Sequence, residues 1–447
     1  MTLKKLMELL SSTNDYPTLK DMFAGMLAAD IAELFERIDD KRTIVAFRLL
    51  SKDMAVDVFA HLSAEKQSAI SKLTNEDELS IIVNELFFDD KIDYLEEMPA
   101  NIVKRILKNS TETERKLINQ FLKYPDNSAG GLMTIELVDL NKSMTVTQAF
   151  ERIRANAPDK ETIYTCYCVD SHRRLEGTVS LKDLILASPE TVIEEIMRKE
   201  ALSVNTHEDQ EHIADLFKKY DLLSLPVVDH EKRLVGIITV DDVVDVIERE
   251  NTEDFHMMAA VHGKAKKDKL LQGSVPHAIR LRLPWLIITL FGGMLAGGII
   301  QIFEEALTAI IVLAMFIPVI MDMGGDVGIQ TSTIVIRGLA TGDINKKNVM
   351  ESLFREVWIG ISMGVICGVV VGAAGQIWQD VPMLGVAVGG AMITTITVAS
   401  FLGAFLPIIF ERLGVDPAVV SGPLITTIKD ITGLLIYFGI ATLVMGI

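Results

Sequence analysis

The sequence predicts a multidomain membrane protein. We expect an α-helical superhelical N-terminal domain, an internally duplicated α/β region, and a five-helix α transmembrane domain. Three observations predict this order: amphipathic segments recur before residue 128, one strand and helix pattern occurs twice within 129–250, and five apolar stretches follow residue 281. The expected domains are therefore 1–128, 129–250 and 281–447, with a connecting helix at 251–280.

Charge is distributed unevenly between the halves of the chain. The first 275 residues contain 35 Lys/Arg and 50 Asp/Glu, whereas residues 276–447 contain 8 and 11. An acidic soluble region argues against nucleic acid as a partner, because nucleic-acid binders carry basic patches. It favours cations instead. Cys166 and Cys168 alternate with Tyr167, which predicts one face of a buried strand in a reducing compartment.

The N-terminal region has a repeating helical pattern. Similar segments begin at Asp30, Asp53, Asp77 and Asp90, each with an acid near its start and apolar residues three and four apart. Such short units bury their apolar faces only by stacking, which predicts a superhelical array. Asp89, Asp90 and Asp93 form its densest acidic group, and the sequence alone favours helix capping on a solvated face for them.

The duplicated region is marked by two glycines at equivalent positions. EGTVSLKDLI from Glu176 and VGIITVDDVV from Val235 share the spacing of Gly, a β-branched pair, Ser/Thr and Asp, and each copy reads strand, helix, strand, strand, helix. This resembles a tandem pair of CBS (cystathionine-β-synthase-type) domains. The resemblance implies a regulatory adenine nucleotide such as ATP at the corners Ser180 with Asp183 and Thr239 with Asp242. Ordinary helix capping is the open alternative.

A charged helix is predicted to connect the soluble and membrane regions. Acids gather at its start and the basic run 264–269 ends it, so the charge reverses along its length. The acids at its start are Asp242, Asp245, Glu250, Glu253 and Asp254.

Five apolar spans are long enough to cross a bilayer. They run over about 286–303, 307–336, 357–378, 383–410 and 419–445. Lys and Arg occur before the first span and in the second and fourth loops, but not in QIFEE or QDVP. The positive-inside rule then predicts a multi-pass protein of the cell membrane with a cytoplasmic N-terminus and an external C-terminus.

The second span contains MDMGGDVGIQ, where three glycines predict a break, either by unwinding or by close backbone approach. Asp322, Asp326, Gln330 and Thr331 lie around it. Together with Asp430 they offer the oxygen ligands that suit Mg²⁺ or Ca²⁺.

Asp430 lies inside the last apolar span. A carboxylate at that depth is costly, so it predicts a protein-lined cation pathway. Neutralisation by the adjacent Lys429, or simple protonation, is the alternative. Five spans with one such carboxylate favour a homodimer in the bilayer with Asp430 doubled on its axis.

The order of these parts resembles the MgtE family of magnesium channels and transporters over essentially the whole chain. The residues that carry the resemblance are YPDNSAGGLMT, TVDDVVDV, MGGDVGIQTSTIVIRGLA and GPLITTIKDITG. It implies a homodimeric Mg²⁺-selective pore with Asp430 as ion-binding residue, closed when cytosolic Mg²⁺ binds the acidic domains. The sensing acids would be Asp89, Asp93, Asp221, Asp242, Asp245, Glu250, Glu253 and Asp254. The family usually has Asn where this chain has Asp326, which leaves the effect on selectivity open.

Two other classes stay open. A secondary transporter would exchange a divalent ion for H⁺ or Na⁺, with Asp430 or Asp326 titrating. A membrane-tethered sensor would need neither a buried carboxylate nor a glycine-rich span. An enzyme is not expected, because the sequence shows no nucleophile–base pair and no ATP-hydrolysis motif.

Overall fold

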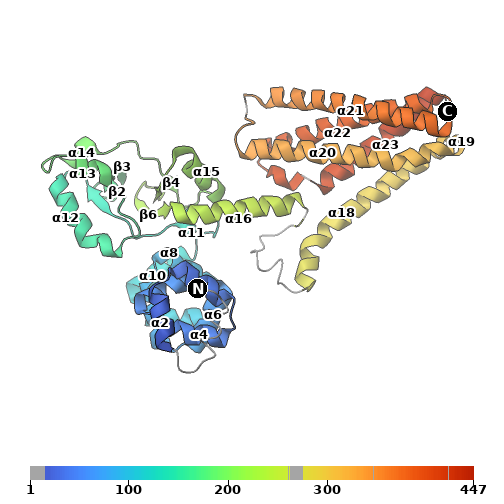
Figure 1. Ribbon diagram of the computed structural model, residues 1–447. Helices are drawn as coiled ribbons and strands as arrows, with labels where there is room; N and C mark the ends of the chain where they lie inside the picture. The colour runs from blue at the N-terminus through green and yellow to red at the C-terminus, as the bar shows by residue number, and fades with distance from the viewer. Residues whose placement is uncertain (1–15, 260, 262–274, 346, 421, 447) are drawn as a thin grey trace. The chain divides into compact units, whose positions relative to one another are not determined.

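The computed structural model describes residues 16–259, 261, 275–345, 347–420 and 422–446. It divides into two compact units, Met1–Glu248 and Arg249–Ile447 (Figure 1). The first contains the helical domain and two small sheets, and the second contains the long apolar helices.

The helical domain is an array of short helices. Each of α3 to α7 contacts the helix two further along the chain, which is the packing expected of a superhelix. This part of the fold prediction is confirmed. The helices are α2 (Tyr16–Ala24), α3 (Ala28–Glu36), α4 (Asp40–Phe47), α5 (Lys52–Ala60), α6 (Ala64–Leu73), α7 (Glu76–Glu85), α8 (Phe88–Glu97), α9 (Ala100–Asn109) and α10 (Glu112–Phe121).

Two similar α/β modules follow, as the duplication predicts. In each, a short strand pairs in parallel with a longer one, which pairs antiparallel with the next. The first contains α11 (Ala129–Leu132), β1 (Asp139–Asn141), α12 (Val146–Asn156), η1 (Ala157–Asp159), β2 (Thr165–Val169), β3 (Leu175–Ser180), α13 (Leu181–Leu186) and α14 (Ile193–Ile196). The second contains β4 (Val204–Asn205), α15 (Gln210–Tyr220), β5 (Ser224–Val228), β6 (Leu234–Thr239) and α16 (Val240–Met258).

The strand prediction for Cys166 and Cys168 is confirmed. Both thiols are buried in the core of the first module, while Tyr167 points to a second core that contains Leu234 and Ile237. The Tyr167 hydroxyl lies 2.6 Å from the Ser224 hydroxyl of the other module. The period-two alternation thus joins the two modules through one strand.

The same steric constraint requires glycine at the two equivalent positions, Gly177 and Gly236. A Cβ on Gly236 would lie 2.6 Å from the Thr134 carbonyl oxygen, and a Cβ on Gly177 would lie 2.6 Å from the Arg198 carbonyl oxygen. Each glycine therefore admits a backbone segment that pairs with its strand. The segment that opens the first module, at Met133 and Thr134, pairs with β6 of the second module.

Among its described residues, the second unit contains five helices that are long and apolar enough to span a membrane, as predicted. They are α18 (Val275–Ile302), α20 (Ile317–Ala340, with the 3₁₀ turn η2, Ile311–Phe316, before it), α21 (Val349–Gln379), α22 (Leu384–Arg412) and α23 (Pro423–Met445). The short α19 (Glu304–Ala309) and η3 (Pro417–Val420) lie between them. α16 runs past the expected domain boundary at residue 250, and the basic run 264–269 lies outside the described residues.

Of the two alternatives expected at the glycines of the second span, unwinding is wrong and close backbone approach is correct. α20 is one continuous helix through Gly324, Gly325 and Gly328, so unwinding does not occur. The alternative of close approach is correct, because a Cβ on Gly325 would lie 2.6 Å from the Lys429 Nζ atom of α23. The missing side chains make room for the neighbouring helix.

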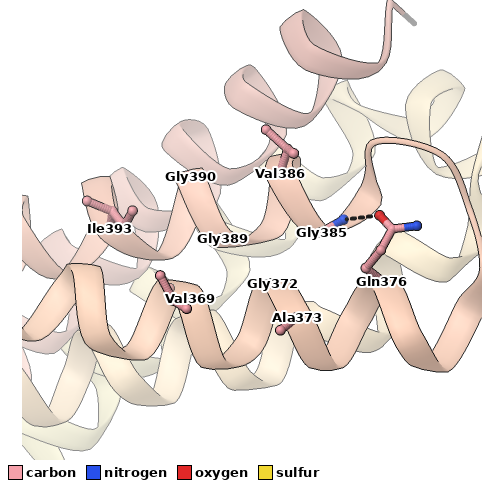
Figure 2. A pocket seen from close by; sticks show the side chains of 10 residues that line it. Val369, Gly372, Ala373, Gln376, Gly385, Val386, Gly389, Gly390 and Ile393 are labelled. Carbon is pink, nitrogen blue, oxygen red and sulfur yellow. Dashed lines mark hydrogen bonds between the residues drawn. The ribbon is translucent and has the colours of Figure 1, made fainter.

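Glycines also set the contact between α21 and α22. A Cβ on Gly372 would lie 2.5 Å from the Gly385 carbonyl oxygen, so the two backbones nearly touch. A groove of 460 Å³ runs along this contact and is lined by Val369 of α21 and Ile393 of α22. The Gln376 side chain also lines it and accepts a hydrogen bond from the Gly385 amide (Figure 2). The groove is lined mostly by apolar groups, which suits packing in a membrane.

Candidate functional site

Three carboxylates from separate parts of the first unit meet in one place. Ligand oxygens of Asp89, Glu136 and Glu161 all lie within 4.8 Å of one another, and each side chain is half-buried. Asp89 is in the first turn of α8, Glu136 follows the segment that pairs with β6, and Glu161 lies between η1 and β2. We call these three residues the acidic cluster.

Backbone contacts hold the acidic cluster in shape. α8 begins after Phe87, whose side chain provides no cap, and the Phe88 amide instead donates to Glu136 Oε2 at 2.9 Å. The Thr134 hydroxyl donates to the same oxygen at 2.9 Å, and the Glu161 amide donates to the Glu136 carbonyl oxygen at 3.0 Å. Glu136 therefore joins the helical domain to the first α/β module.

Several further carboxylates lie near the acidic cluster and repel one another. Burial raises the pKa of Glu161 to about 8, and repulsion from Asp241 and Asp242 adds to it. Burial and the nearby Asp93 raise the pKa of Asp90 to about 6. Burial, with repulsion from Asp241, raises the pKa of Asp242 to about 7, and burial together with Asp242 raises the pKa of Asp89 well above its ordinary value. The charged state of these acids is unfavourable without a counter-charge.

The residues of the acidic cluster fit a hard divalent cation. Among the described residues, Glu161 Oε2 is buried without a hydrogen-bond partner, which is unusual for a polar atom and leaves it free to bind an ion. Carboxylate oxygens are the ligands that Mg²⁺ and Ca²⁺ prefer, and a divalent ion would remove the mutual repulsion.

The structure brings three of the predicted sensing acids together. Asp89 and Asp242 interact, and Asp93 raises the pKa of both Asp90 and Asp242. Asp221 instead ends α15 in the left-handed conformation (φ 51°) and is exposed. The remaining four lie along α16, with Asp245 exposed and Glu250, Glu253 and Asp254 half-buried.

Sequence reasoning missed two central members of this site. Glu136 stands two residues after the motif that ends at Thr134, and Glu161 stands in a loop with no pattern around it. Asp90 and Asp241 adjoin predicted acids, so the local acid density was a usable signal for them. For Glu161 only the fold provides the signal, because its partners are distant in sequence.

The two predicted nucleotide corners have matching geometry. The Ser180 hydroxyl donates to Asp183 Oδ2 at 2.7 Å and accepts from the Asp183 amide at 3.0 Å. The Thr239 hydroxyl donates to Asp242 Oδ2 at 2.9 Å. Ser180 is the N-cap of α13, so capping accounts for this contact without a nucleotide.

In the second unit, Asp430 lies on α23 beside a buried lysine. Lys429 Nζ lies 2.8 Å from Asp430 Oδ1 and also donates to the Met321 carbonyl oxygen of α20. The Lys429 side chain is 5% exposed and that of Asp430 is 22% exposed. The structure therefore contains the ion pair in which Lys429 offsets the charge of Asp430. The Asp430 side chain nevertheless remains partly exposed.

α20 presents a polar face within its span. Asp322, Asp326 and Gln330 are four residues apart and all exposed in the single chain. Thr331 is separate from this face: it is buried, and its hydroxyl lies 3.3 Å from the Ser400 hydroxyl of α22. Of the predicted pore residues, Thr331 therefore contacts the helix bundle, whereas Asp326 and Gln330 share one stripe.

In the part of the chain that the structure describes, paired α/β modules with an acidic cluster are followed by five helices that are long and apolar enough to span a membrane and that contain charged groups. This arrangement is typical of a multi-pass membrane transporter. Family models agree with each part: the MgtE intracellular N domain matches residues 26–127, the CBS domain matches 129–190 and 193–249, and the divalent cation transporter MgtE matches 317–440.

The chain belongs to the MgtE family of magnesium transporters. It is 38% identical to magnesium transporter MgtE of Thermus thermophilus over 96% of both chains, and 36% identical to that of Bacillus subtilis over 92% of this chain and 91% of the relative. A solved cytosolic domain of the Mg²⁺ channel MgtE in complex with ATP covers 55% of this chain and all of its own, at 38% identity and a TM-score of 0.52. The family resemblance and the fold class are confirmed.

Proposed function

We propose that this protein is a Mg²⁺-selective channel that mediates passive, voltage-driven Mg²⁺ influx and is closed by cytosolic Mg²⁺ at its acidic N-terminal and CBS domains. The observation that carries the proposal is Asp430, a partly exposed carboxylate inside a membrane span. Relatives that match almost the whole chain are named magnesium transporters, which supports Mg²⁺ as the ion.

The pore is proposed to form between two copies of the chain. A stripe with Asp322, Asp326 and Gln330 is costly against lipid, so it needs water or protein in front of it. Two copies would place two such stripes and two Asp430 side chains around a wet path. Mg²⁺ keeps much of its water, so few direct ligands suffice.

Closure would use the acidic cluster as the sensor. Mg²⁺ there offsets the repulsion that raises the pKa of Asp89, Asp242 and Glu161, and so favours the compact arrangement of the helical domain on the α/β modules. A ligand shifts such an equilibrium only by its differential affinity for the two states. The predicted acids of α16 and Asp221 would add further sites.

The driving force is the membrane potential. A divalent ion that crosses 100 mV gains about 4.6 kcal/mol, so influx needs no other energy source. The alternative is exchange of a divalent cation for H⁺ or Na⁺. We further propose that the N-terminus is cytoplasmic, and that an adenine nucleotide regulates the protein at the Ser180 and Thr239 corners. The relative solved with ATP supports the nucleotide.

Divalent flux into proteoliposomes tests the proposal. With a negative potential inside and no Mg²⁺ in the lumen, the wild-type protein should transport Mg²⁺ without any H⁺ or Na⁺ gradient. Asp430→Asn should reduce the rate at least about a hundredfold, because a neutral amide binds a divalent ion far less well. Glu411→Gln, at the exposed end of α22, is the matched control and should keep the wild-type rate. Transport that persists in Asp430→Asn contradicts the pore site, and dependence on a counter-ion gradient supports exchange.

A further inference from the structure

We propose that Lys429 tunes ion affinity in the pore: it is an internal cation, anchored on α20, that weakens the binding of a divalent ion to Asp430 so that the ion can leave. The inference rests on the proposed function and on the contacts of Lys429 inside the membrane domain.

A nearly inaccessible lysine in a membrane span requires compensation. Lys429 has it twice, from the carboxylate of Asp430 at 2.8 Å and from the Met321 carbonyl oxygen. The contacts come from different helices, so the ammonium joins α23 to α20. Its Nζ atom sits against Gly325, where a Cβ would come within 2.6 Å, and its stem lies 3.4 Å from the position of a Cβ on Gly324. The glycine pair therefore forms the seat of the lysine.

The seat fixes the charge next to the proposed ion site. One carboxylate oxygen of Asp430 forms an ion pair with Lys429, while the Asp430 side chain remains 22% exposed. A divalent ion that approaches Asp430 therefore meets a carboxylate that is already partly neutralised. Conduction requires binding strong enough to enter and weak enough to leave. A fixed ammonium beside the carboxylate shifts that balance toward release.

The test compares external Mg²⁺ concentration at half-maximal uptake with the maximal rate, in proteoliposomes without luminal Mg²⁺. Lys429→Met keeps the stem and removes the charge, and should lower the half-saturating concentration about tenfold while lowering the maximal rate. Lys429→Arg keeps the charge and should stay near the wild-type half-saturation. A change in maximal rate alone in Lys429→Met indicates a structural role only and overturns the proposal.

A second variant covers the case in which Lys429→Met does not fold. Gly325→Ala displaces the ammonium from its seat and should shift half-saturation in the same direction by a smaller factor. It should cause no further shift in the Lys429→Met background, because the lysine is then absent. Gly439→Ala in α23 is the control, since a Cβ there would have no described atom within 4 Å. An equal shift in both backgrounds, or no shift in Gly325→Ala, overturns the proposal. A wild-type protein that does not transport Mg²⁺ overturns the proposed function instead.

Discussion

Glu161 shows how the environment of one residue creates a sensor. Its backbone amide donates a hydrogen bond to the Glu136 carbonyl oxygen, and its neighbours are acids. One of its carboxylate oxygens is buried without a hydrogen-bond partner in the described part of the chain. Burial and the nearby acids raise the pKa of Glu161, so without a cation they favour the protonated carboxyl. A divalent ion and a proton therefore compete for the same oxygens.

Competition predicts a pH-dependent Mg²⁺ response. Glu161 titrates at about 8 in the folded protein, compared with an ordinary value of 4.5. Between these values the folded state binds more protons than the unfolded state, so the stability of the metal-free protein falls as pH rises. Mg²⁺ needs the ionised acids, so the rise in melting temperature that Mg²⁺ causes should be larger at pH 8 than at pH 6.

Thermal melting of the full chain in detergent, with and without Mg²⁺, measures this response. Glu161→Gln should remove much of the pH dependence, because the amide neither titrates nor binds the ion well. Glu195→Gln, on the exposed side of α14, should behave as wild type. An Mg²⁺ effect of equal size at both pH values would argue that the acidic cluster is not the binding place.

At the scale of secondary-structure elements, glycines repeatedly allow two backbone segments to pack closely. β6 pairs with the segment at Thr134 because Gly236 has no side chain. The Thr134 amide donates to the Ile237 carbonyl oxygen at 2.8 Å, and the Ile237 amide donates to the Thr134 carbonyl oxygen at 2.9 Å. That pairing places Glu136 next to α8, since it lies two residues beyond Thr134. The strand contact thus builds one wall of the acidic cluster.

Gly236→Ala should break this arrangement. The added Cβ would lie 2.6 Å from the Thr134 carbonyl oxygen, so the segment must move and two hydrogen bonds weaken. Overpacking of this kind costs about 1–3 kcal/mol, which corresponds to a melting temperature lower by several degrees. Gly25→Ala is the control, because its Cβ would lie at an ordinary 3.8 Å from the Met22 carbonyl oxygen. Equal melting temperatures for the two variants would contradict the argument.

The same scale explains what the sequence could predict. Periodicity identifies the stacked helices and five spans, and duplication identifies the two modules, because these patterns are local. The pairing of Thr134 with β6 is not local: Met133 opens the first copy yet packs with the second. Local patterns therefore place Asp89 and Asp242 on their elements, but only the fold adds Glu136 and Glu161 between them. Likewise, the glycines of α20 predict either unwinding or close backbone approach. Only the position of Lys429 beside Gly325 shows that close approach is correct.

At the scale of the whole molecule, the soluble and membrane units should have separable effects on transport. In the proposed mechanism the acidic cluster sets how much cytosolic Mg²⁺ closes the pore, whereas Asp430 sets whether the open pore conducts. α16 continues from the Thr239 corner across the boundary between the units, so it is the described element that links them in sequence. A population shift in the first unit then changes the open fraction without changing the ion site.

Glu161→Gln should therefore leave external half-saturation unchanged but weaken inhibition by cytosolic Mg²⁺, with a shift of the inhibitory concentration of about tenfold for the loss of one charged ligand. Patch recordings with controlled Mg²⁺ on each side of the membrane measure both quantities on the same protein. Glu195→Gln serves again as the matched control, since its loss of charge is the same and its place is exposed. Asp430→Asn should show the reverse pattern, with conduction lost and with the Mg²⁺-induced rise in melting temperature retained. If Glu161→Gln instead altered external half-saturation and left cytosolic inhibition intact, the assignment of sensor and pore to separate units would be wrong.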